Sequence, residues 1–197
     1  PDPVLQQVEN FNSPIETAND SFKSVSKYFD RITRPEQILA SLPQAIQLML
    51  DPADCGPATI AMSQDVQGET FDYPEIFFEE RIHEVRRVHP DPRQVKQAAE
   101  KLMNSKQPII ISGGGVLYSE AEEELSIFAK KHNIPVTSTV MGIGCMTRDD
   151  PYYISAVGAL GEGSSNSLSK DTDLALAIGT KLADFTTGSW ANFENPN

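Results

Sequence analysis

The stretch "PIIISGGGVLYSEAEEEL", residues 108–125, decides the fold class of this chain. An apolar run leads directly into three glycines, and a segment rich in glutamate with helical spacing follows. A short apolar run that ends in glycine is typical of a strand buried in a parallel sheet. The glycines behind it serve either as a tight turn or as a cradle for an anion.

The pattern repeats along the second half of the chain. A helix is predicted over 92–105, with Asp91 as its N-cap, and further strands over 134–139 and 174–180. Continuous apolar strands that alternate with helices predict an α/β fold: a Rossmann-like parallel sheet with helices on both faces and right-handed crossovers. No final strand is expected after the last one, so we expect this domain to be truncated at its C-terminus.

A helix is also predicted over 119–132, where Ser119 and Glu122 form a capping box. Its acidic run cannot converge on one metal ion, because successive helical positions point in different directions, and acidic residues in a first turn favour the helix dipole. The three histidines show no ligand spacing, so we expect no metal site: His83, His89 and His132.

The first half of the chain has a different character. A helix is predicted over about 35–50, with Thr33 as a cap, and a strand follows in "PATIAM". Pro43 interrupts this helix, and we expect a short first piece that feeds a second helix from about Leu42.

Three parts of the chain follow from this pattern. Residues 1–62 are the C-terminal part of a second α/β domain, 63–90 an interdomain linker in which aromatic residues act as surface anchors, and 91–197 the Rossmann-like domain. The chain starts without an initiator Met or a secretory signal, which indicates a processed chain or an excised fragment.

Composition excludes several classes of function. A net charge of −12 argues against nucleic acid and anionic membrane surfaces as partners. No run of eighteen apolar residues exists to span a membrane. Cys55 and Cys145 form no metal motif, and reduced thiols in a cytoplasmic protein are the favoured interpretation.

Two strand-end loops are the candidate site. They comprise Gly113, Gly114 and Gly115 after the first strand and Gly179 and Thr180 after the last. The triple glycine fits neither the dinucleotide fingerprint nor the phosphate-binding loop, which needs a following Lys, so a tight turn is favoured over a nucleotide cradle. Both loops lie on the same sheet edge, which favours a pocket there.

The segment "DFTTGSWANF", 184–193, contains the only Trp of the chain. Two interpretations of it stay open. Its polar and aromatic side chains either line a pocket at a strand's carboxyl edge, or Trp190 anchors a surface loop.

The order of motifs resembles the superfamily of thiamin-diphosphate-dependent decarboxylases and acetohydroxyacid synthases. The resemblance covers nearly the whole chain and rests on "DSFK", "RPEQI", "LPQAI", "GPATIAMSQDVQ", "DPRQVKQAAEKL", "QPIIISGGGV", "IPVTSTVMGIG", "DDPYY", "GALG" and "DTDLALAIGT". Two departures stand out: Ser63 where the family usually has Pro, and "GALGEGSS" where it has a "GVxGTS" pattern.

This resemblance implies a parent enzyme that uses thiamin diphosphate and Mg²⁺. The stretches "DPADCGPATIAMSQDVQGETFDYPEIFFEERIHEVRR", "SGGGVLYSEA" and "DFTTGSWANF" look most like its ring-opening hydrolases of inositol breakdown, whose substrate is a cyclic 1,2-diketone and whose product is a deoxy-glucuronic acid. The family's activating glutamate and its G-D-G metal motif do not occur in these residues. We therefore expect no catalytic residue in this segment and no activity of the segment alone.

The resemblance also implies positions and partners. Phe22 and Lys23, in "DSFK", are expected near the active site, where Lys23 either holds a polar substrate group or lies at a subunit interface. The parent is expected to be a homodimer or homotetramer. Two alternatives remain: a carboligase or decarboxylase that binds an FAD-like nucleotide in the middle domain, and a scaffold domain without catalysis.

Overall fold

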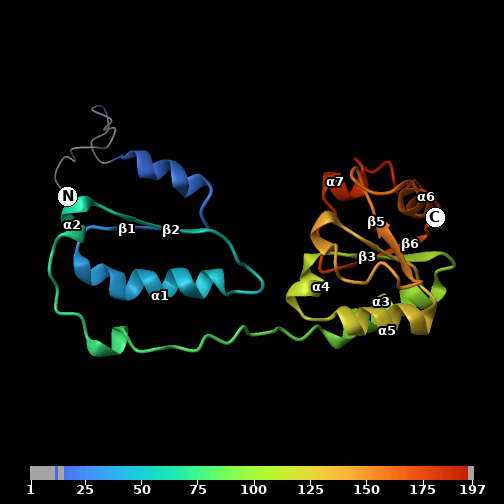
Figure 1. The fold of residues 1–197 in the computed structure, drawn as a ribbon, viewed down its shortest axis with the longest axis horizontal. Coiled ribbons are helices and arrows are strands. Elements are labelled where there is room, and N and C mark those ends of the chain that lie inside the picture. The colour runs from blue at the N-terminus through green and yellow to red at the C-terminus, as the bar shows by residue number, and fades with distance from the viewer. Residues whose placement is uncertain (1–11, 13–15, 195–197) are drawn as a thin grey trace. The chain divides into compact units, whose positions relative to one another are not determined.

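The structure is a computed structural model that describes residue 12 and residues 16–194. The chain divides into two compact units, Pro1–His89 and Pro90–Asn197. Figure 1 shows the helices and strands of both units.

The first unit is built on two parallel strands, β1 (Tyr28–Ile32) and β2 (Ala58–Met62), paired from Tyr28 opposite Ala58 to Ile32 opposite Met62. Helix α1 (Ile38–Met49) packs against both strands. The buried Ser41 hydroxyl of α1 donates a hydrogen bond to the Asp30 carboxylate of β1, which ties the helix to the sheet. The two predicted elements, helix and "PATIAM" strand, are thus present.

The break predicted near Leu42 does not occur. Helix α1 runs unbroken past Pro43. A proline in a helix removes the one N–H that would bond the carbonyl four residues earlier, here that of Leu39, and the other bonds of the helix survive.

The predicted cap at Thr33 is also wrong. A 3₁₀ turn, η2 (Pro35–Gln37), precedes α1, and its N-cap is Arg34. The Gln37 side chain accepts from the amides of Thr33 (2.6 Å) and Arg34 (2.9 Å). The Thr33 amide therefore donates a hydrogen bond at this helix start, and the side chain of Gln37, which lies within the turn, is the capping group.

Residues 63–89 contain two short helical pieces, α2 (Gln64–Gln67) and the 3₁₀ turn η3 (Glu75–Phe77). Tyr73 stacks on Phe77 with ring centroids 5.9 Å apart, and its hydroxyl donates to the Pro35 carbonyl at 3.3 Å. The hydrogen bond to Pro35 ties Tyr73, and the ring stacked on it, to the helix start of the same unit.

The second unit is a four-stranded sheet in which every pair is parallel. The strand order is β5-β4-β3-β6. The strands are β3 (Pro108–Ser112), β4 (Val136–Ser138), β5 (Tyr153–Ala156) and β6 (Leu174–Ile178). This confirms the predicted Rossmann-like α/β fold with a parallel sheet, although β5 was not predicted.

Five helices of the described chain accompany this sheet: α3 (Pro92–Asn104), α4 (Gly114–Tyr118), α5 (Glu122–His132), α6 (Gly163–Asp171) and α7 (Asp184–Thr187). Ile110 faces one core, together with Val116 of α4 and Leu125 of α5. Ile109 and Ile111 face the other side of the sheet. Both faces of β3 are thus buried, as its apolar sequence requires.

The capping box predicted at Ser119 is wrong. Ser119 is the C-cap of α4, and α5 begins only at Glu122. Between the two helices Glu120 has φ +53°, and the Ala121 amide returns to the Val116 carbonyl at 3.1 Å. The left-handed residue ends α4, so Glu122 is the first residue of α5 and not the third, the position from which a capping-box glutamate reaches back.

Helix α3 begins as predicted, with the Asp91 side chain accepting from the Arg93 amide at 2.8 Å. Its predicted core face is largely exposed, however, and only Leu102 packs against the core while Val95 is 49% exposed. The helix contacts β6, the edge strand of the described sheet, so little of the sheet lies under it.

Candidate functional site

The carboxyl ends of β3 and β6 meet where the strand order changes direction. Along the chain β3 is followed by β4 on one side, whereas β6 returns to its other side. Open parallel sheets bind ligands outside such a point. The structure brings the two predicted loops, 113–115 and 179–180, together here.

These two loops touch backbone to backbone. A Cβ on Gly113 would lie 2.4 Å from both the Gly179 carbonyl oxygen and Thr180 Cβ, and one on Gly115 would lie 2.6 Å from Gly179 Cα. Gly179 itself has φ +57°. Glycine is therefore needed on both sides for steric reasons.

The amides of the triple glycine are also engaged. Gly113 donates to the Ile178 carbonyl and Gly115 to the Gly179 carbonyl, each at 2.9 Å. A phosphate cradle needs amides that point toward the ligand. Two of the three instead bond the neighbouring loop, so packing alone accounts for these glycines, and a nucleotide role for the loops stays a prediction.

Gly114 faces a different neighbour. A Cβ on it would lie 3.1 Å from the Met141 carbonyl oxygen in the 3₁₀ turn η4 (Val140–Gly142), which follows β4. The side chains of Met141 and Ile143 are 69% and 59% exposed. The sheet edge beside β4 is therefore apolar.

The segment after β6 crosses this edge and reaches the end of β5. A Cβ on Gly158, just beyond β5, would lie 2.0 Å from the Phe185 carbonyl oxygen in α7. Thr187 is fully buried, whereas Trp190 is 61% exposed. Trp190 thus turns toward solvent at the carboxyl edge.

Phe22 and Lys23 lie in the first unit, in the 3₁₀ helix η1 (Ala18–Ser24). Phe22 is 50% exposed. Lys23 Nζ lies 2.7 Å from Asp20 Oδ1 and 5.2 Å from the centroid of the Phe29 ring. The Lys23 ammonium already has an acidic and an aromatic neighbour, and its expected proximity to an active site stays a prediction.

Asp20 organises this part of the first unit. Its carboxylate accepts from Lys23, from the Thr17 amide at 2.6 Å and from Arg31 Nη2 at 2.8 Å. These bonds, with Lys23 contributing most, hold the pKa of Asp20 well below its usual range. The arrangement joins η1 to β1.

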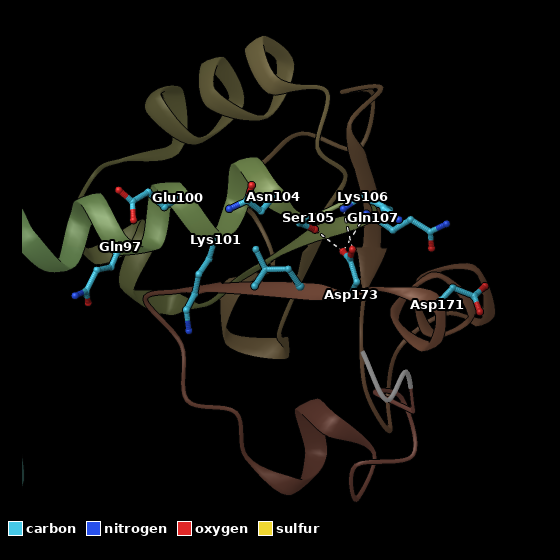
Figure 2. Close-up of a pocket in the computed structure, with 10 residues that line it drawn as sticks. Gln97, Glu100, Lys101, Asn104, Ser105, Lys106, Gln107, Asp171 and Asp173 are labelled. Atoms are coloured by element: carbon cyan, nitrogen blue, oxygen red, sulfur yellow. Dashed lines mark hydrogen bonds between the residues drawn. The ribbon is translucent and has the colours of Figure 1, made fainter.

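A polar hollow of about 980 Å³ lies at the opposite, amino edge of the second sheet (Figure 2). Its lining includes Gln97, Lys101, Asn104, Lys106, Asp171 and Asp173. The Asp173 carboxylate accepts from the Ser105 hydroxyl and from the amides of Lys106 (2.7 Å) and Gln107 (2.9 Å). Asp173 therefore stabilises the turn that leads into β3, and Figure 2 shows the Asp173 side chain directed at that turn.

Within the described ranges, no group of three or more His, Cys, Asp or Glu side chains could hold a metal ion. The same part of the chain contains no helix with the length and apolar content needed to cross a membrane.

Fold and site together define a Rossmann-like α/β domain whose strand-end loops close on each other. Residues 95–197 match the family model of the thiamine pyrophosphate enzyme central domain, so the chain belongs to that family.

Several relatives match over essentially the whole chain. A protein of Clostridium perfringens (strain 13 / Type A) named 3D-(3,5/4)-trihydroxycyclohexane-1,2-dione hydrolase is 46% identical over 197 residues, which is 100% of this chain and 31% of the relative. Proteins of the same name from Clostridium tetani and Bacillus cereus (strain AH820) are 45% and 43% identical over 195 residues, which is 99% of this chain and 30% of each relative. The chain thus spans about a third of the length of these relatives.

One feature of the carboxyl edge was not predicted from the sequence. Gly188, Ser189 and Trp190 all have positive φ, at +56°, +55° and +67°. Gly188 was the available signal, because glycine after a helix often adopts the left-handed conformation. The residue types of Ser189 and Trp190 do not predict that the left-handed conformation continues after Gly188.

Proposed function

We propose that the full-length protein hydrolyses a trihydroxycyclohexane-1,2-dione with thiamin diphosphate and Mg²⁺ as cofactors. The observation that carries this proposal is the 43–46% identity, over 99–100% of the chain, to relatives that share that name. The match of residues 95–197 to the central domain of thiamine pyrophosphate enzymes supports the cofactor.

The reaction adds one water across the bond between the two carbonyl carbons. One of these carbons becomes a carboxylic acid and the other an aldehyde, which opens the ring to a 5-deoxy-glucuronic acid. In such enzymes the cofactor supplies the electron sink for carbon–carbon cleavage, and the protein supplies orientation and electrostatics. The described residues offer no group of three or more metal-ligating side chains, and the expected absence of a catalytic residue from this segment stays a prediction.

The test uses the full-length protein with thiamin diphosphate, Mg²⁺ and the cyclic diketone. We expect consumption of the diketone and formation of one equivalent of acid, followed by NMR and by proton release. A protein that instead joins two 2-keto acids with loss of CO₂, or that carries a bound flavin, would contradict the hydrolase and support the carboligase alternative.

We also propose that the full-length protein is a homodimer or homotetramer in the cytoplasm. The family resemblance supports this, because related enzymes build their cofactor sites between subunits. Light scattering of the full-length protein measures its mass, and a monomer that is active would contradict the proposal.

A further inference from the structure

The turn that follows α7 has an unusual backbone. Gly188, Ser189 and Trp190 are three successive residues in the left-handed region. L-residues visit that region as single residues, and a bulky side chain there is an outlier. Strain of this kind persists only where the surroundings impose it, and it concentrates at functional sites.

Hydrogen bonds to exposed Asp184 and to buried Thr187 hold this turn. Ser189 donates through its amide to the Asp184 carbonyl (3.1 Å) and through its hydroxyl to Asp184 Oδ1 (2.8 Å). The Trp190 amide donates to Thr187 Oγ1 at 3.2 Å, and Thr187 is fully buried. The Asn192 amide closes the turn on the Thr187 carbonyl at 3.3 Å.

The turn displays its tryptophan instead of burying it. The indole of Trp190 is 61% exposed and rests edge-to-face on Phe193, with centroids 6.3 Å apart. Phe193 in turn packs against the core around Ile109 and Ile111. The indole therefore has a fixed base and an open surface, which a residue that only anchors a loop would not have.

Other exposed apolar side chains come from the neighbouring loops at the same sheet edge. Phe185 of α7 is 65% exposed, and Leu160, in the loop after β5, is 67% exposed. The Ala159 amide donates to the Phe185 carbonyl at 2.7 Å, so the two loops are joined. We call the exposed side chains of Leu160, Phe185 and Trp190 the apolar platform.

We propose that Trp190 is a substrate-binding residue, whose indole face stacks on the C–H face of the six-membered ring of a cyclic polyol or its diketone. This inference rests on the proposed function. A trihydroxycyclohexane-1,2-dione has an apolar ring face and polar edges, and a tryptophan offers a large, rigid apolar surface with one N–H donor for such an edge. The platform also lies at the carboxyl ends of the strands, where parallel sheets bind ligands.

The experiment compares the full-length wild type with Trp190→Ala and Trp190→Phe. Ile127→Ala is the matched control, because Ile127 is a 57% exposed apolar residue of α5, away from the platform. The readouts are KM and kcat for the diketone, and binding of myo-inositol, an unreactive cyclic polyol, by calorimetry. Thermal unfolding and oligomeric mass are measured on the same samples.

We expect Trp190→Ala to raise KM and weaken inositol binding roughly three- to tenfold, as loss of one ring-stacking contact would. Trp190→Phe retains most of the binding, Ile127→Ala all of it, and unfolding midpoint and mass stay unchanged. An unchanged KM in Trp190→Ala overturns the inference. So does a lower unfolding midpoint or a smaller mass, because the platform then binds another part of the polypeptide.

The proposed function fails separately. If the wild type leaves the diketone intact, the hydrolase assignment is wrong. Inositol binding still decides the role of Trp190 in that case. Binding that weakens in Trp190→Ala supports the platform, whereas no binding, or binding that does not change in Trp190→Ala, overturns it.

Discussion

A Cβ atom on Gly113 would lie 2.4 Å from the carbonyl oxygen of Gly179, so the turns after β3 and β6 are in direct backbone contact. In doubly wound sheets this is the crevice that holds a ligand. Here the two turns fill it with their own backbone, and the amides of Gly113 and Gly115 donate to the carbonyls of Ile178 and Gly179. The glycines therefore serve packing at the centre of the domain.

Gly113→Ala should destabilise the domain, because its methyl group has no space between the two turns. Overpacking of this kind costs about 1–3 kcal/mol of the free energy of unfolding. Gly163→Ala is the control, since nothing lies within 4 Å of a Cβ at that position. Urea unfolding of the full-length protein measures both variants. Equal stability of the two would show that the turns can separate at no cost.

Asp173 should make the stability of the second unit depend on pH. Bonds from Ser105 first, then from the Lys106 amide, lower the pKa of the folded carboxyl below its usual value. The unfolded chain then binds more protons in acid, so this contribution is present above about pH 4 and is lost as pH falls through the folded pKa.

Asp173→Asn tests this dependence. We expect a lower urea midpoint at pH 7 and a smaller further loss between pH 5 and 3 than in the wild type, because the titrating group is gone. Asp149→Asn, at an exposed position, serves as the control for removal of one charge. If the stability of Asp173→Asn fell with pH as steeply as that of the wild type, Asp173 would not be the group whose titration changes the stability.

The two cysteines should differ in reactivity. Cys145 is fully buried, and burial raises the pKa of its thiol, whereas Cys55 is exposed. Alkylation requires an accessible thiolate. Peptide mass spectrometry after iodoacetamide treatment of the native full-length protein should find Cys145 unmodified until denaturant is added. Modification of Cys145 at the rate of a free thiol would contradict its place in the core.

Three of the four described strands of the second unit, β3, β4 and β6, were predicted because their signal is local, whereas β5 was not. An apolar run that ends in glycine marks β3 and β6 directly, and Asp91 before Pro92 marks the start of α3. The start of α5 was not predictable, because Glu120 adopts a left-handed conformation that its residue type does not favour. The amides of Glu120 and Ala121 return there to the carbonyls of Leu117 and Val116, which closes α4.

One part of the candidate site was likewise predictable from the sequence and another part was not. Glycines at strand ends are visible in sequence, but the closure of 113–115 on 179–180 depends on strand order, which sequence alone does not set. Whether the apolar face of α3 is exposed or buried likewise depends on what lies beside β6. Helical periodicity identified its apolar stripe but not whether the stripe is covered.

Asn166 should control the order of the turn that carries Trp190. Its side chain accepts from the Gly158 amide (2.8 Å) and from Asn192 Nδ2 (3.0 Å), and donates to the Gly158 carbonyl (3.0 Å). It thereby joins the end of β5 to the last residue of the strained turn. Loss of this amide leaves three polar groups without their partner.

Asn166→Leu should therefore cost about 1–3 kcal/mol of unfolding free energy. It should also raise amide hydrogen exchange at Ser189–Asn192 while exchange in α5 stays at the wild-type level, because α5 belongs to the other core. Asn104→Leu, at an exposed position of α3, controls for the polar-to-apolar change. If exchange at the turn is unchanged in Asn166→Leu, the left-handed conformation is imposed from within α7, by Asp184 and Thr187 alone.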